Sequence, residues 1–153
     1  MTLSNRMIFA GIVLLLIASA AILTTGILGS MRPSGNPPTV EVMKSTCDRP
    51  PGFILIIADL SGFNNSIGHG APAHPWPIVH VQRGDVVRFL VCNRDPTQPH
   101  GFAIQFYLDS GVVLASGDAY QIVFTATEVG TFEFFCNILC TIHIFMRGQL
   151  IVS

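Results

Sequence analysis

The chain has 153 residues, of which 50% are hydrophobic and only 11% are charged, and its formal net charge is −1. A chain of this length builds one compact domain and little else. Because it carries no basic excess, the composition argues against nucleic acid as a partner.

The first predicted element is a membrane anchor. Residues 7–28 contain no charge, proline, Asn or Gln, and a helix of that length rises roughly 33 Å, enough to cross a bilayer's hydrocarbon core. A cleaved signal peptide is the alternative, but its apolar region would run only about 7–15 residues. We therefore predict an uncleaved anchor over residues 1–29, with the rest of the chain outside the cytoplasm in a single-pass arrangement.

Residues 30–51 are rich in Pro, Gly and Ser and predict a linker. From residue 52 to 153 the chain alternates short apolar runs with turn residues, which is typical of an all-β sandwich or barrel. The predicted strands are 53–60, two within 77–93 joined by a turn at 82–85, 100–108, 112–116, 117–127, 131–136 and 148–153.

The stretch CNILCTIHIFM, residues 136–146, carries the chemistry. Thiolates, imidazoles and thioethers are the soft and borderline ligands that suit copper. Cys136 ends a predicted strand, and Cys140, His143 and Met146 follow at intervals that let a tight loop gather them around one point. A lone Cys or Met is more often core filling, and a lone His is more often a hydrogen-bonded surface residue, but the group together predicts a metal site.

His100 is the best candidate for a further ligand. It follows the proline-stiffened loop 95–99 and begins a predicted strand, and a rigid loop suits an electron-transfer site because the ligand should not move when the charge changes. Zinc is disfavoured, because methionine is a poor zinc ligand and structural zinc sites usually come as two spaced pairs.

The segment GTFEFFCNILCTIHIFMRGQLIV, together with PHGFAI upstream, resembles subunit II of haem-copper terminal oxidases (cytochrome c oxidase), in its short, single-anchor form. The resemblance covers the anchor, the linker and the following domain. It implies a Greek-key cupredoxin fold, all-β with one N-terminal transmembrane helix, and a dinuclear copper A centre of two copper ions.

The resemblance also implies the ligands and their roles. The thiolates of Cys136 and Cys140 would bridge the two ions. His100 and His143 would each bind one ion. Met146 would be a weak ligand to one ion, and the backbone carbonyl of Ile138 would be a weak ligand to the other. Such a subunit takes single electrons from a cytochrome c or blue-copper donor. It passes them to haem in subunit I for dioxygen reduction, so it would be a non-catalytic part of a respiratory oxidoreductase complex.

One departure keeps a second reading open. The family pattern is Cys-x3-Cys-x3-His-x2-Met, whereas this chain has one residue fewer between Cys140 and His143. The Cys-x2-His-x2-Met spacing is that of the amicyanin group of blue copper proteins. A membrane-tethered carrier with a single copper is therefore the alternative, and it would leave Cys136 as an idle thiol. A copper delivery or storage protein is a third reading, which the phenylalanine-rich surroundings disfavour.

Two other features are left open. Cys47 and Cys92 either form a disulfide outside the cytoplasm or remain as two buried thiols. In the family that the sequence resembles, aromatic residues at the exposed edge near the copper admit electrons from the donor, and Phe63 or Trp76 would be the residue in that role.

Overall fold

The computed structural model describes residues 39–66, 75–140 and 145–153. Within these ranges no helix is long and apolar enough to cross a membrane, and the predicted anchor lies outside them. The described residues form strands β1 Glu41–Ser45, β2 Ile54–Asp59, β3 Gly62–Phe63, β4 Ile78–Val81, β5 Val86–Asn93, β6 His100–Ile104, β7 Leu108–Leu114, β8 Ala119–Thr125, β9 Gly130–Phe135 and β10 Arg147–Val152.

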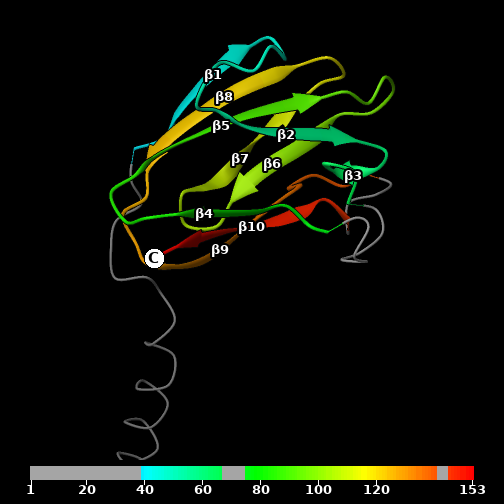
Figure 1. Ribbon diagram of the computed structural model, residues 1–153. Helices are drawn as coiled ribbons and strands as arrows, with labels where there is room; N and C mark the ends of the chain where they lie inside the picture. Colours follow the sequence, from blue (N-terminus) through cyan, green and yellow to red (C-terminus); the bar gives the residue numbers. More distant parts are fainter. Residues whose placement is uncertain (1–38, 67–74, 141–144) are drawn as a thin grey trace, which may run out of the picture. The chain divides into compact units, whose positions relative to one another are not determined.

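These strands make two sheets of five. In Figure 1, strands β1, β8, β5 and β2 of the first sheet lie in the upper part, and strands β4, β10 and β9 of the second sheet lie in the lower part. The first has the order β1-β8-β5-β2-β3 and the second the order β4-β10-β9-β6-β7. Most neighbours are antiparallel, but β2 runs parallel to β5 and β4 runs parallel to β10. Because buried side chains of both sheets pack into one shared core, the described residues form an all-β sandwich, which confirms the fold class that the strand spacing predicts.

Aromatic rings from both sheets fill the core. Phe134 of β9 packs on Phe89, Phe102 and Phe63, with ring centroids 5.6–6.2 Å apart. All four side chains are fully buried, and rings at such distances in tilted pairs add to the apolar area that they bury. The expectation that Phe63 stands at an exposed edge is therefore wrong, because Phe63 faces inward from β3.

The connection between β6 and β7 lies four residues earlier in the chain than the sequence pattern predicts. The expected turn at 109–111 lies inside β7, and the chain reverses at residues 105–107 instead. Phe106 takes a left-handed φ of 68°, and its N–H donates to Asp109 Oδ1 at 2.9 Å. Tyr107 and Leu108 are buried, so the apolar residues assigned to the end of one strand begin the next.

Strand β1 was not predicted. It lies within residues 30–51, for which the sequence predicts a linker, and it pairs with β8 from Glu41↔Val123 to Ser45↔Ala119. Four of its five side chains are exposed. Because neither face of this edge strand is buried, its sequence lacks the alternation of apolar and polar residues that predicts a strand. The sandwich therefore includes residues 41–45.

Candidate metal centre

Three neighbouring strands bring the predicted ligands to one end of the second sheet. His100 is the first residue of β6, Cys136 directly follows β9, and Met146 directly precedes β10. β9 pairs antiparallel with both β6 and β10, and its last residue, Phe135, lies opposite Arg147 at the start of β10 and opposite Ala103 of β6, three residues after His100. The Cys136 N–H donates to the Met146 carbonyl at 3.0 Å, which closes the base of the loop between them.

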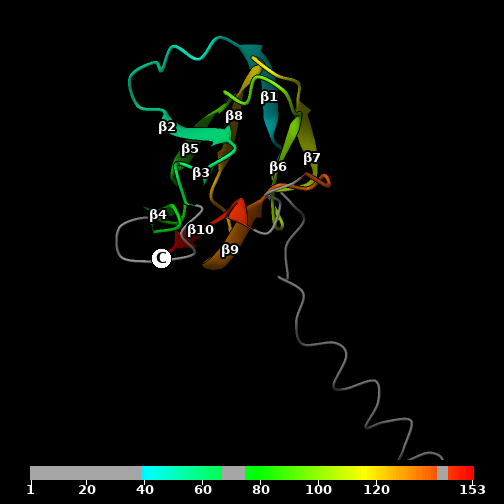
Figure 2. The same cartoon turned by 90° about the vertical axis from the view of Figure 1, so that its right-hand side faces the viewer.

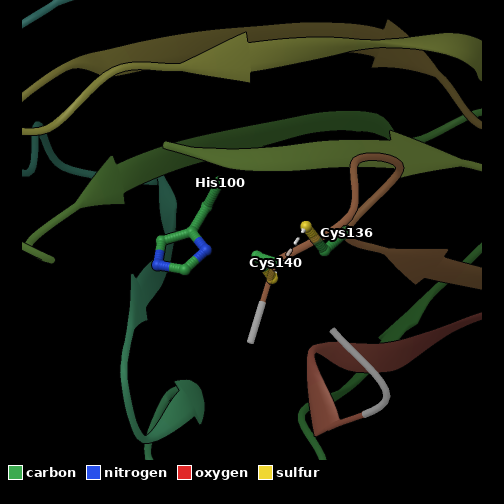
Figure 3. Close-up of side chains that lie close together, drawn as sticks. All are labelled: His100, Cys136 and Cys140. Atoms are coloured by element: carbon green, nitrogen blue, oxygen red, sulfur yellow. Dashed lines mark hydrogen bonds between the residues drawn. The ribbon is translucent and has the colours of Figure 1, made fainter. Parts of the chain in front are cut away.

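The predicted ligands that the structure describes are in contact. The ligand atoms of His100, Cys136 and Cys140 all lie within 4.8 Å of one another (Figure 3). The two sulfurs are 3.7 Å apart, and Met146 Sδ lies 3.7 Å from Cys140 Sγ. The Ile138 carbonyl oxygen lies 3.3 Å from Cys136 Sγ. The sixth predicted ligand, His143, lies outside the described residues.

A buried carboxylate fixes the orientation of His100. Its Nε2 lies 3.1 Å from Asp95 Oδ2, and both side chains are fully buried. Burial by itself would raise the pKa of Asp95, but hydrogen bonds from the Thr97 N–H and hydroxyl, the Gln98 N–H and His100 together hold that pKa below its ordinary value. An ionised carboxylate can only accept, so Nε2 carries the imidazole proton and Nδ1 presents a lone pair.

That lone pair faces the sulfurs. His100 Nδ1 is buried and has no hydrogen-bond partner among the described residues, and Figure 3 shows this ring nitrogen turned toward Cys136 and Cys140. A buried polar atom without a partner costs about 1–3 kcal/mol, a cost that a metal ion bound at this point would remove. One imidazole nitrogen, two thiol sulfurs and a thioether are a donor set suited to copper, so the residues present fit the ion that the sequence predicts.

The loop before His100 is held by side chains that sequence reasoning missed. Asn93 donates from Nδ2 to the carbonyls of Gln98 and Leu114, at 2.9 and 3.0 Å, and accepts the Asp95 N–H at its Oδ1 at 2.9 Å. The available signal was an aspartate in a proline-rich loop five positions before the predicted histidine ligand. Because metal-bound histidines commonly donate their second N–H to a carboxylate, that spacing alone could have nominated Asp95.

The ligand loop packs tightly on β6 and β7. The Gly101 N–H donates to Cys136 Sγ at 3.2 Å, and a Cβ at Gly101 would lie 2.1 Å from Asn137 Oδ1 and 2.9 Å from the Asn137 backbone nitrogen. Only glycine permits this approach. Asn137 donates from Nδ2 to the Ser110 carbonyl at 3.1 Å, so the segment that follows Cys136 is fastened to the hairpin that carries His100.

Apolar side chains exclude water from the inner side of the site. Phe134 and Met146 are fully buried, and Ile138, Cys140 and Phe145 pack against the main core from partly buried positions. The buried Ser66 hydroxyl donates to the Phe145 carbonyl at 3.0 Å and so holds the far side of the loop. Leu139, in contrast, is 94% exposed. The sulfurs therefore have buried apolar side chains on their inner side, while the loop between the two cysteines reaches the protein surface at Leu139.

Replacing Asp95 by asparagine should weaken metal binding. One amide oxygen cannot accept both the His100 proton and the Thr97 and Gln98 donors, so the –NH2 group must face one of these sets. Loss of such a partner typically costs about 10–100-fold in metal affinity, which a competition titration with a copper chelator measures. Asp118→Asn is the matched control, because Asp118 also caps a loop but pairs with Lys44 and the Ala115 N–H. Equal affinities for the two variants would contradict the role given to Asp95.

The fold and the donor set together define an all-β sandwich with a soft-donor metal site at one end. Residues 76–152 match the family described as the cupredoxin-like domain. The chain belongs to this family, and its fold is that of cupredoxin-type copper electron-transfer proteins. No curated protein matches the sequence.

Several solved structures resemble the chain. The copper-containing nitrite reductase from Thermus scotoductus SA-01 is 12% identical, with a TM-score of 0.50 over 69% of this chain and 32% of that one. Amicyanin from Paracoccus versutus is 23% identical, with a TM-score of 0.49 over 74% of this chain and 97% of that one. Auracyanin from Roseiflexus castenholzii is 17% identical, with a TM-score of 0.49 over 67% and 97%. At these identities the likeness concerns the fold.

Proposed function

We propose that this protein is the electron-entry subunit of a membrane terminal oxidase and holds a dinuclear copper A centre. One observation carries the proposal. The sulfurs of Cys136 and Cys140 lie 3.7 Å apart, beside His100 Nδ1, which has no hydrogen-bond partner in the part of the chain that the structure describes. Two bonds of about 2.3 Å, the length of a zinc–thiolate bond, span at most about 4.6 Å, so both sulfurs are close enough to share an ion.

The residues of the site suit rapid electron exchange. Two bridged copper ions, when bound, would supply a one-electron couple whose charge is shared between them. The protein's part is to keep its own groups still: Asp95 fixes the His100 ring, the Gly101 N–H donates to the Cys136 sulfur, and Asn137 ties down the loop. Hydrogen bonds to sulfur, weak axial ligands and burial tune the potential of such a site.

The remaining parts of the proposal come from the resemblance to oxidase subunit II. The predicted anchor over 1–29 holds the copper domain at the extracytoplasmic face of the membrane. A cytochrome c or a blue-copper protein delivers single electrons, and haem in subunit I receives them for dioxygen reduction. The exposed Leu139, in the loop between the two cysteines, offers the donor an apolar contact close to the sulfurs.

A membrane-tethered carrier with one copper is the second candidate. It is favoured by the short spacing Cys140-x2-His143-x2-Met146 and by the 3.7 Å contact between Met146 Sδ and Cys140 Sγ. In that arrangement Cys136 has no task at the metal, although its sulfur is fully buried in the site and accepts a backbone hydrogen bond. A copper delivery or storage role is disfavoured, because release requires exchange of ligands that are packed into the core.

Counting copper decides between these candidates. The full chain, purified in detergent and loaded with copper, is expected to bind two ions per chain and to give an electron-spin spectrum of one unpaired electron shared by two copper nuclei. Co-purification with a haem-containing subunit and electron uptake from a reduced cytochrome c or blue-copper donor are the accompanying results. One copper per chain, with a single-nucleus spectrum, would refute the dinuclear centre and establish the mononuclear carrier.

A further inference from the structure

A second pair of thiols lies on the other side of the first sheet. In β5, Phe89 and Val91 belong to the main core, whereas Leu90 and Cys92 belong to a small separate cluster with Ala119. Side chains alternate along a strand, so these two sets point to opposite faces of the sheet. Cys47 packs against the small cluster, and its thiol forms a hydrogen bond with that of Cys92.

The strand order explains why the two thiols meet. Ala119 of β8 lies opposite Cys92 on one side and opposite Ser45 of β1 on the other. The chain leaving β1 must then pass β8 and β5 to reach β2, a connection drawn as the cyan loop in Figure 2. Cys47 lies at the start of this crossing. Because Ala119 has a small side chain, the crossing segment can approach the sheet and bring Cys47 against Cys92.

The pair is separate from the candidate metal centre. Cys136 and Cys140 belong to the main core cluster, while Cys47 and Cys92 belong to the small cluster on the outer face of the first sheet. A disulfide between a cysteine of one cluster and a cysteine of the other would have to pass through the first sheet. The four cysteines therefore divide into two pairs, each with its own surroundings.

We propose that Cys47 and Cys92 form a disulfide that staples the β1–β2 crossing to β5. The bond closes a loop from residue 47 to residue 92. It ties β1, which among the described strands pairs with β8 alone, to the central strand of the sheet. The inference goes beyond the proposed electron-transfer role and requires no copper. It requires only an oxidising compartment, which the extracytoplasmic location would supply.

The chemistry is a thiol–disulfide exchange with an oxidised small-molecule or protein disulfide. Cys47 is partly exposed, whereas Cys92 is fully buried, so the oxidant meets Cys47 first. The Cys47 thiolate attacks one sulfur of the oxidant and expels the other half as a thiol. The Cys92 sulfur then loses its proton, attacks the Cys47 sulfur and expels the second half. Two protein thiols and one disulfide thus become one protein disulfide and two free thiols.

The reduced pair has a characteristic reactivity. Burial, together with the hydrogen bond and charge of Cys47, raises the pKa of the Cys92 thiol to about 12. Because the thiolate is the nucleophile, Cys92 in the folded, reduced protein should resist alkylation while Cys47 reacts. That order of reaction matches the sequence of steps above.

Peptide mapping tests the bond directly. The full chain in detergent is equilibrated with oxidised glutathione, unfolded in denaturant with a copper chelator, treated with N-ethylmaleimide and digested without reductant. We expect the peptides of Cys47 and Cys92 to be joined, and to separate when a reductant is added before digestion. Recovery of both cysteines as maleimide adducts, or of either one joined to Cys136 or Cys140, would overturn the proposal.

Stability gives a second readout. A disulfide that closes a long loop should raise the Tm of the oxidised wild type by roughly 10 °C over the reduced protein. Cys47→Ser and Cys92→Ser should match the reduced wild type and should not respond to reductant, while the copper bound per chain stays unchanged. If the Tm of the wild-type protein did not change when reductant was added, the proposed disulfide would be contradicted. Since the copper count is measured separately, failure of the staple and failure of the proposed function are distinguishable.

Discussion

Replacing Cys136 by serine is expected to abolish the copper pair. The Cys136 sulfur is fully buried, lies 3.7 Å from Cys140 Sγ and accepts a hydrogen bond from the Gly101 N–H. Its burial and its contacts therefore place it within the candidate metal centre. A serine hydroxyl is a hard and weakly acidic donor that does not replace a thiolate on copper. The bound copper should fall from two ions per chain to one or none, and electron uptake from the donor should fall to background.

Cys92→Ser is the matched control for this experiment. It removes the same sulfur atom from an equally buried position, but on the outer face of the first sheet. Copper content by elemental analysis and the electron-spin spectrum should remain those of the wild type. If instead Cys136→Ser kept a wild-type spectrum and turned over with a cytochrome or blue-copper donor, Cys136 would have no role at the metal.

Replacing Phe134 by alanine is expected to give the largest loss of stability. Its ring is fully buried, contacts the rings of Phe63, Phe89 and Phe102, and lies against Gly148, where a Cβ would be only 2.2 Å from it. Removing a buried phenyl group costs about 3–5 kcal/mol through lost burial and the cavity left behind. That is a large part of the roughly 5–15 kcal/mol that stabilises a typical domain.

Denaturant unfolding of the copper-free full chain, followed by circular dichroism, measures this loss. Phe53→Ala is the comparison, because it removes the same atoms from a partly buried position in the small outer cluster. Its free energy of unfolding should fall by less than half as much. Equal losses in the two variants would show that the aromatic contacts of Phe134 do not dominate the core.

Much of the site could be predicted because it is local in the sequence. Cys136, Cys140 and Met146 lie within eleven residues, and the pattern of short apolar runs around them predicts an all-β domain. The features that were missed depend on long-range contacts or on weak local signals. β1 has mostly exposed side chains, and the β6–β7 turn uses a phenylalanine at positive φ instead of a glycine.

The role of Phe63 shows the same limit. Near a loop rich in Gly and Pro, a phenylalanine has no local signal that separates an exposed ring from a buried one. Its burial is set by Phe102 and Phe134, which come from strands of the other sheet. Burial of this kind depends on which strands face each other, and the alternation within one strand does not encode that choice.

The sequence by itself determined the kinds of candidate ligand, whose donor atoms suit a soft metal such as copper, and the all-β class, because residue type and alternation are properties of short segments. Tertiary structure decided between arrangements that the sequence left open: it places Asp95 against the far nitrogen of His100, and it places Cys47 beside Cys92 in the small cluster on the outer face of the first sheet. These contacts follow from the pairing and crossing of strands that are far apart in the chain. Such pairing is selected by the burial energy of the whole core, which no single segment carries.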